Sequence, residues 1–258
     1  MAVDVYGWPP VGTLGHDWTI DAPTDSSVSP LTGFERISAN QPERRMASLV
    51  VSSLGLGRMG AGYVESLKRL LKGRQHLVRL TSYPVNWYLD AAVDAGFRQS
   101  QRINWTADGV ELGWTDGAVP LHWYDGSILQ ATDVSLTSNG FPAVRVTGLP
   151  PSRMVARPGE FVTVFADVDD TTGTTVQVMA PAMSGADGAA TIRLFEALPN
   201  VGRINLGTSE TRVFRPVGDL PRSMQPLNAD WTYSWEFREV FPTEVGGFTE
   251  VPLWWEAT

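Results

Sequence analysis

A glycine-rich turn is the first part of this sequence whose residue types could do chemistry. It reads Gly55-Leu-Gly57-Arg-Met-Gly60, it follows a β-branched run at residues 46–53, and it precedes a helical pattern at residues 61–72. In dinucleotide-binding folds, a turn of this kind joins a strand to a helix, and the helix N-terminus faces the pyrophosphate. One hypothesis is therefore an oxidoreductase that uses NAD or NADP.

The residues after this helix argue against a dinucleotide site. A doubly wound fold needs further βαβ units, but hairpin signals follow Gly73 in place of crossover helices. The expected next strand, residues 77–83, has no acidic residue to bind a ribose, although Arg79 could favour a 2′-phosphate. We therefore favour a plain connection between strand and helix, and we expect no cofactor.

An acidic segment with some likeness to a calcium loop also fails on spacing. Asp167, Asp169 and Asp170 could supply oxygen ligands, but Thr172 and Val178 stand where that loop needs a Gly and a bidentate Glu. A polar hairpin turn is the better interpretation.

Histidines and other carboxylates give no better site. The chain has three histidines, His16, His76 and His122. They are too far apart in sequence for a metal-binding helix. Glu236 and Glu239, with Asp230, could form a catalytic carboxylate pair, but residues three apart on a strand point to opposite faces. We therefore expect no metal site and no enzymatic activity.

A short Trp-Asp-Gly pattern occurs three times, nine residues apart. The copies begin at Trp105, Trp114 and Trp123, and apolar residues flank each Asp-Gly. Asp-Gly in this setting predicts a type I′ hairpin turn, because both central positions need positive φ. We therefore expect a β-meander here. The indoles could stack on sugar rings, as in a carbohydrate-binding adhesion module that contacts host surface glycans, or they could pack under their own hairpins.

Strands and turns dominate the elements that must position these residues. The one amphipathic helix is expected at residues 61–72, with Gly73 just after its end. The first 45 residues are β or loop. Further strands are expected at 76–83, 143–147, 160–165, 174–179, 189–195 and 213–216. The aromatic stretch 231–240 is long enough to be a strand that completes an earlier sheet.

Composition supports a mainly β protein and excludes several classes of function. The 258 residues are 43% hydrophobic and only 19% charged, with 25 Gly, 18 Pro and 10 Trp, which favours many short strands joined by tight turns. A net charge of -8 and a pI near 4.9 argue against broad attraction to nucleic acid or anionic lipid. There is no Cys, no apolar run long enough to insert in a membrane, and no signal-peptide pattern at residues 1–10. We expect a protein that is made and kept soluble in a cytoplasm.

Four short stretches follow one another in a suggestive order. Residues 42–73 form a strand and a helix that ends Leu-x-x-Leu-Leu-x-Gly, and Gly148-Leu-Pro150-Pro151-Ser152 leads to Arg157-Pro158-Gly159-Glu160-Phe161-Val162. Asp187-Gly188-Ala-Ala-Thr-Ile-Arg-Leu comes next, and Val213-Phe214-Arg215 precedes WTYSWEFRE at 231–239. In this order they resemble the distal tail proteins of long-tailed bacteriophages and the related tail components of gene transfer agents. Glu160-Phe161-Val162 replaces the commoner Asp-Tyr-Ile. The resemblance covers somewhat under half of the chain, and residues 101–139 and the first 40 residues do not match it.

The resemblance implies two modules in a mainly β chain. Residues 1–95 would form a ring-forming β-sandwich domain with one short α-helix at 61–72. Residues 96–212 would form an inserted, peripheral small β-barrel that is OB-like or lectin-like, and residues 213–258 would be closing strands that return to the ring domain.

It also implies a structural virion protein of the phage tail tip. Copies would form a ring, expected to be a hexamer, that joins the tail-tube protein to the hub or baseplate protein and lets DNA pass. A receptor-binding or fibre protein is a further expected partner, and neither sequence-specific nucleic acid binding nor membrane insertion is expected. The implied location is the virion tail tip, after assembly in the host bacterial cytoplasm. Acidic side chains on the lumen would keep DNA from adhering.

Two sets of residues are candidates for these contacts. The helix and the closing strand would supply the oligomer interface, or the same side chains would fill the core. The interface candidates are Tyr63, Leu67, Leu71, Trp231, Trp235 and Phe237. Trp105, Trp114 and Trp123 are the candidate glycan contacts.

Overall fold

The computed structural model confirms the mainly β class. It describes residues 2–39, 41–52, 59–82, 97–103, 105–108, 110–117, 119–121, 123–125, 128–166, 172–222 and 230–256. Of these residues, 54% lie in strands and 7% in helices, and the architecture fits the β-sandwich class. The chain divides into two compact units: unit 1 contains Met1–Ser82 and Thr211–Thr258, and unit 2 contains Tyr83–Glu210. The sequence-based boundaries lie after residues 95 and 212.

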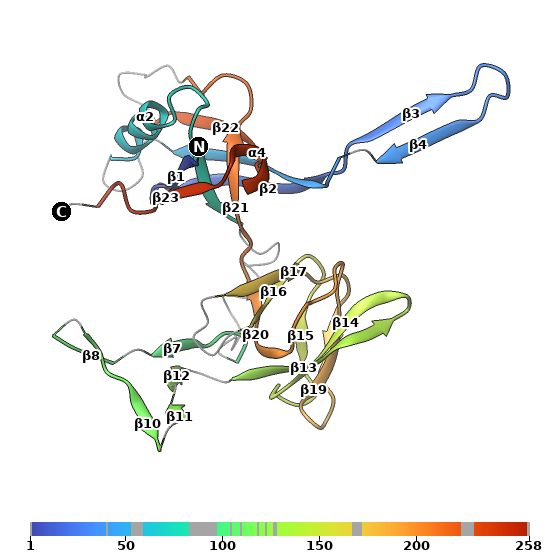
Figure 1. Ribbon diagram of the computed structural model, residues 1–258, viewed down its shortest axis with the longest axis vertical. Coiled ribbons are helices and arrows are strands. Elements are labelled where there is room, and N and C mark those ends of the chain that lie inside the picture. Colours follow the sequence, from blue (N-terminus) through green and yellow to red (C-terminus); the bar gives the residue numbers. More distant parts are fainter. Residues whose placement is uncertain are drawn as a thin grey trace. The chain divides into compact units, whose positions relative to one another are not determined.

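Unit 1 is built on a mixed seven-stranded sheet (Figure 1). The strands, in spatial order, are β2 (Thr13–Asp21), β5 (Arg44–Ser52), β22 (Thr232–Glu239), β21 (Thr211–Pro216), β6 (Leu77–Thr81), β1 (Val3–Gly7) and β23 (Phe248–Val251). β1 is parallel to both of its neighbours, and the other pairs are antiparallel. The closing strand β22 lies between β5 and β21, which confirms that it completes an earlier sheet.

The core of unit 1 lies between this sheet and one helix. Side chains of β22 alternate between exposed and buried, so Tyr233, Trp235 and Phe237 point to the same face. Helix α2 (Gly60–Leu70) covers that face with Val64 and Leu67. Replacing a buried Trp or Phe by Ala in such a core typically costs about 3–5 kcal/mol.

The end of α2 shows how the sequence stops this helix. Leu71 is the C-cap, and the next two residues, Lys72 and Gly73, take positive φ angles of 45° and 77°. A left-handed residue after the C-cap turns the backbone away from the helix axis, so that N–H groups further along the chain can reach the last carbonyls of the helix. The N–H groups of Gln75 and His76 both donate to the Leu71 carbonyl, at 3.1 and 3.3 Å. The helix predicted at 61–72 is therefore present, and it ends two residues earlier than expected.

A second helical segment, α4 (Pro242–Val245), is a single turn that the sequence did not predict. It ends at Gly246, whose φ of 71° is left-handed. No helix among the described residues is long and apolar enough to span a membrane.

A long hairpin, β3 (Thr24–Val28) with β4 (Glu35–Ala39), continues from β2 and leads into β5. We call residues 24–39 the arm. Every described residue of β3 and β4 is exposed, and Figure 1 shows the arm extending beyond the sheet of its own unit. The sequence indicated only β or loop for this region.

Unit 2 contains an antiparallel six-stranded sheet. Its strands, in spatial order, are β17 (Gly173–Gln177), β16 (Phe161–Phe165), β20 (Gly202–Thr208), β13 (Leu129–Ser138), β14 (Phe141–Thr147) and β19 (Ala189–Arg193). A separate pair is formed by β15 (Met154–Ala156) and β18 (Ala182–Met183). Apolar side chains such as Val144, Val162, Ile192 and Leu206 are fully buried in its core.

The expected small barrel is not closed in the part of the chain that the structure describes. Just past the ends of the two edge strands, β17 and β19, a single isolated β-bridge joins Val178 to Leu194. Continuous pairing of the edge strands is what closes a barrel. A single bridge leaves the sheet open, so the barrel is corrected to an open sheet of the sandwich class.

The region 101–125, which we call the Trp repeat, is not a meander. Its first strand, β7 (Gln101–Ile103), pairs with its last, β12 (Trp123–Asp125), and forms a stem. Two hairpins lie between them: β8 (Thr106–Ala107) with β9 (Val110–Glu111), and β10 (Trp114–Asp116) with β11 (Val119–Leu121).

Only one of the three predicted Asp-Gly turns has the expected register. Ala107 pairs with Val110, and Asp108 has a φ of 52°, so the first turn is centred as predicted. In the second hairpin Asp116 pairs with Val119, which moves the turn one residue later, to Gly117 with φ 64°. In the third copy Asp125 pairs with Gln101 in the stem, and Gly126 lies outside the described residues.

Candidate functional site

The structure gives the dinucleotide hypothesis little support. Gly60 is the first residue of α2, while Gly55 and Gly57 lie outside the described residues. Arg79, the candidate for a 2′-phosphate, forms an ion pair with Glu250 instead; its Nε lies 3.0 Å from Glu250 Oε2. A guanidinium engaged in this way is already neutralised by a carboxylate.

Several residues weighed as metal ligands lie outside the part of the chain that the structure describes. Asp167, Asp169 and Asp170 are among them, as is His122. Across the described ranges, no three His, Cys, Asp or Glu side chains gather where they could hold a metal ion.

The two described histidines each contact an aromatic ring. His16 stacks on Trp18 with 5.7 Å between ring centroids, and burial lowers the pKa of His16, which nearby Asp17 only partly offsets. His76 lies edge-on to Tyr6, with its Nδ1 3.5 Å from an Asp4 oxygen. Each described imidazole therefore packs against a neighbouring aromatic side chain.

The candidate carboxylate pair is separated, as the sequence predicted. On β22, Glu236 is exposed and Glu239 is buried on the opposite face. One oxygen of Glu239 accepts the Arg45 backbone N–H at 2.7 Å, and the other lies 3.7 Å from Arg212 Nε. Asp230 accepts a hydrogen bond from Ser52 Oγ at 2.9 Å. Glu239 therefore fastens β22 to β5 and β21.

Four of the six candidate interface residues lie in the core of unit 1. Leu67, Leu71, Trp235 and Phe237 are each at most 1% exposed. Trp235 and Phe237 stack on each other with 5.5 Å between centroids. Since these side chains have no accessible surface to offer a neighbour, the structure places them in the packing role that the sequence also allowed.

The other two candidates, Tyr63 and Trp231, are partly buried by contacts within the same unit. Trp231 Nε1 donates to the hydroxyl of Tyr233 at 3.3 Å, and that hydroxyl donates to Glu65 of α2 at 3.0 Å. Tyr63 lies edge-on to Trp254, 6.3 Å between centroids. The helix thus contacts both the closing strand and the C-terminal segment.

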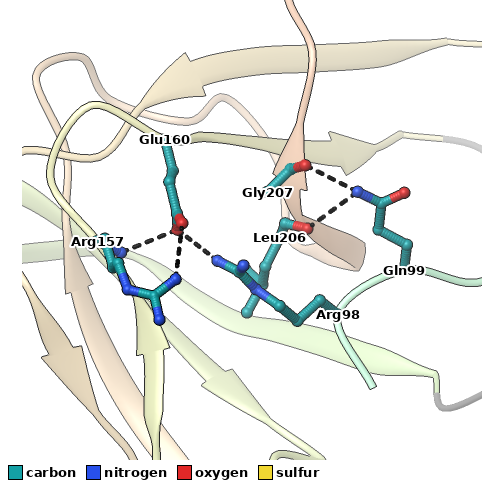
Figure 2. Close-up of polar contacts among 6 residues, drawn as sticks. All are labelled: Arg98, Gln99, Arg157, Glu160, Leu206 and Gly207. Atoms are coloured by element: carbon teal, nitrogen blue, oxygen red, sulfur yellow. Dashed lines mark hydrogen bonds and ion pairs between the residues drawn. The ribbon is translucent and has the colours of Figure 1, made fainter. Parts of the chain in front are cut away.

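A buried ion pair in unit 2 was missed by the sequence analysis (Figure 2). The guanidinium of Arg98 contacts the carboxylate of Glu160, and the two residues are 8% and 1% exposed. The same carboxylate accepts the Arg157 backbone N–H at 2.9 Å, while the Arg157 guanidinium lies 3.6 Å away. Removing one partner of such a pair leaves an uncompensated buried charge.

Beside this ion pair, residues 98 and 99 bind a β-bulge in β20 (Figure 2). Val162 pairs with Leu206 but Phe161 pairs with Thr208, which leaves Gly207 as the extra residue, with φ 65°. The Gln99 amide donates to the Gly207 carbonyl at 2.8 Å. Left-handed backbone at a bulge favours Gly.

The bulge also limits the space at position 207. The N–H of Leu206 donates to the Arg98 carbonyl at 2.7 Å. A Cβ at Gly207 would lie 3.2–3.4 Å from the Arg98 guanidinium. The charged cluster therefore fastens the segment just before the Trp repeat to the sheet.

A buried arginine fastens the stem of the Trp repeat to the same sheet. The Arg203 guanidinium on β20 lies 5.1 Å from the ring centroid of Tyr124 and 4.1 Å from that of Phe165. It also donates to the Ser100 carbonyl and hydroxyl, both at 2.9 Å. Cation–π and charged hydrogen bonds of this kind hold the stem in a fixed orientation.

The three candidate glycan contacts are all half-exposed. Trp105, Trp114 and Trp123 expose 52%, 51% and 51% of their surface. They lie on the short hairpins and stem of unit 2, outside its hydrophobic core. About half of each indole is therefore covered and half is open, so packing against the hairpins and stacking on sugar rings both stay predictions.

The arm carries the two most exposed large apolar side chains of the described chain, Leu31 and Phe34, and two further exposed ones. Leu31 is 94%, Phe34 74%, Ile37 67% and Val28 61% exposed. The tip is closed by hydrogen bonds between Ser29 and its neighbours: the Ser29 N–H donates to the Phe34 carbonyl at 3.0 Å, and the Gly33 N–H donates to the Ser29 carbonyl at 2.9 Å. Four large exposed apolar side chains on one hairpin make the arm a candidate contact surface.

Signals for these features were present only in part. Pro158-Gly159 before a charged residue and a buried strand indicated a turn, but nothing local indicated that Glu160 would meet Arg98, 62 residues away. For the arm, the alternation of Val28 with polar neighbours was too short to separate a strand from a loop.

No protein-family model matches the chain. A search of curated proteins likewise finds no significant match.

Proposed function

We propose that this protein is a structural subunit of a phage-type tail tip, which assembles with copies of itself into a ring between the tail tube and the hub or baseplate. The resemblance of four ordered stretches to distal tail proteins motivates the tail-tip assignment. The exposed apolar face of the arm is the observation that carries the assembly.

The register of the arm separates its two faces. Directly opposed residues share a face, and the pairs alternate along the hairpin. Ser26 with Ile37 and Val28 with Glu35 belong to one face, which holds both large apolar side chains of the two strands, Val28 and Ile37. Ser27 with Arg36 belongs to the other, polar face. An alternation of this kind is typical of a strand pair with one buried face, yet every residue here is exposed.

The arm also has unpaired edges. β3 and β4 pair only with each other in the described chain, so each has an outer row of backbone N–H and C=O groups. A two-stranded hairpin without further packing is at best marginally stable in water. Contact with a neighbouring subunit would both cover the apolar face and pair an edge.

A second copy of the chain is the partner that fits a ring. Every subunit of a cyclic assembly donates one surface and accepts at another, so one arm per chain suffices to close the ring. The sheet of unit 1 has two edge strands, β2 and β23, that could receive it.

Light scattering coupled to size exclusion tests the proposal. We expect the full chain to elute at a multiple of 28.2 kDa and negative-stain images of the peak to show closed rings with a central channel. A protein that stays at the monomer mass up to about 1 mM, where weak contacts still populate complexes, would contradict it. Open fibres in place of rings would contradict the tail-tip assignment but not self-association.

A further inference from the structure

We propose that the Trp repeat is a binding site for a neutral oligosaccharide of pyranose units. The inference is independent of ring assembly, because it concerns unit 2 and the arm belongs to unit 1.

A nine-residue period brings an aliphatic residue opposite each tryptophan. Three aliphatic residues stand two positions before the three tryptophans, with the same spacing. In the structure each tryptophan meets the aliphatic residue of the next copy, and the last copy closes back on the first. The pairs are Trp105 with Leu112, Trp114 with Leu121, and Trp123 with Ile103. The repeat thus presents three chemically similar pairs, two at the bases of the hairpins and one at the end of the stem where the hairpins begin.

The exposure of these pairs is that of a stacking platform. The tryptophans are 51–52% exposed and their aliphatic partners 40–44%. An indole with neighbours on one side and solvent on the other exposes about half of its surface. Apolar groups gathered in this way on a protein surface mark a place of interaction.

The anchored face of the stem shows where one indole must point. Tyr124 is held against Arg203 of β20, 5.1 Å from its ring centroid. Side chains alternate along a strand, so Trp123 and Asp125 lie on the opposite face from Tyr124. The same alternation places Asp116 on the face of Trp114 in β10. Two of the three indoles therefore have a carboxylate two residues away on the same face.

This combination matches the chemistry of a sugar. A pyranose ring has an apolar face of C–H groups that can lie on an indole, and a rim of hydroxyls that donate to carboxylate oxygens. The segment 101–125 carries four carboxylates and one arginine, which disfavours anionic polymers such as nucleic acid. Three similar platforms on one element favour a chain of sugars over a single sugar.

Ligand-observed saturation-transfer NMR tests the site directly. The full chain would be titrated with cellohexaose, maltohexaose and chitohexaose, each up to about 1 mM, and with oligogalacturonate as the anionic comparison. We expect transfer to at least one neutral hexasaccharide, weaker transfer to its monosaccharide and none to oligogalacturonate. Trp114→Ala and Trp123→Ala should each weaken binding about tenfold, and Asp116→Asn should weaken it less.

Matched controls separate binding from folding and from assembly. Phe195 is 54% exposed in the same unit but outside the repeat, so Phe195→Ala should bind like the unchanged protein. Melting curves and circular dichroism should be alike for all variants, because the substituted side chains are half-exposed. The absence of transfer from every neutral hexasaccharide, or equal transfer after all three tryptophans are replaced, would overturn the proposal. So would a loss of assembled mass in the triple variant, since that would make the surface a protein interface.

Discussion

Replacing the two largest side chains at the tip of the arm should abolish self-association without unfolding the subunit. The variant is Leu31→Ser with Phe34→Ser. Both side chains are exposed in the isolated chain, at 94% and 74%, so the folded subunit loses almost no packing when they are removed. Surface substitutions of this kind usually change stability by less than about 0.5 kcal/mol.

The expected loss of association follows from the exposed area. Fully burying one Val, Leu, Ile or Phe side chain provides roughly 1.5–3 kcal/mol. The four apolar side chains of the arm are 61–94% exposed, so covering them would provide roughly 4–9 kcal/mol per arm. Leu31 and Phe34 account for roughly 2.5–5 kcal/mol of this, which corresponds to about two to four orders of magnitude in an association constant.

Light scattering over a dilution series measures this change. The unchanged protein and the variant would be compared from about 1 mM to about 1 µM, the range in which contacts of roughly 4–8 kcal/mol dissociate. Val201→Ser is the matched control, because Val201 is 54% exposed and lies in unit 2. It should leave the assembled mass unchanged.

The reasoning would be refuted by a variant that assembles as strongly as the unchanged protein. It would equally be refuted if Val201→Ser weakened assembly as much as the change in the arm, because general loss of apolar surface would then explain the effect. A variant with a clearly lower melting temperature would show that the arm stabilises its own subunit.

Three further changes test the internal contacts. Glu160→Gln should lower the free energy of unfolding of unit 2 by about 3–5 kcal/mol, because the Arg98 charge would remain buried without its partner. Urea denaturation would measure this loss. A change under about 1 kcal/mol would mean that water reaches the ion pair. Gly207→Ala should destabilise the protein more than Gly218→Ala. Both glycines have left-handed φ, but only at position 207 would the added Cβ lie within 3.4 Å of a guanidinium. Equal melting temperatures of the two variants would contradict this steric effect. The folded protein lowers the pKa of His16 below its ordinary value, because burial favours the neutral imidazole. The contribution of His16 to stability is therefore present above about pH 6.5 and is lost as the pH falls through the folded pKa. If the melting temperature of His16→Gln depended on pH in the same way as that of the unchanged protein, this role of His16 would be ruled out.

The sequence by itself determined the local elements, because local periodicity is a property of neighbouring residues. The long aromatic stretch at residues 231–240 predicted β22, and the recurrence of Val64, Leu67 and Leu71 predicted α2, with its end near Gly73. Periodicity also showed that Glu236 and Glu239 would lie on opposite faces of one strand.

Only the tertiary structure decided which strands pair and what covers each face. The third Asp-Gly was expected to close a hairpin, but β12 pairs with β7, because backbone groups take whichever partner the fold brings near. Leu67 and Trp235 suited a core or an interface equally well, and the sheet of their own unit buries them. Ile37 has the same apolar character and remains exposed. A pattern of side chains fixes which face is apolar, whereas burial depends on segments far away in the sequence, and no local signal carries that information.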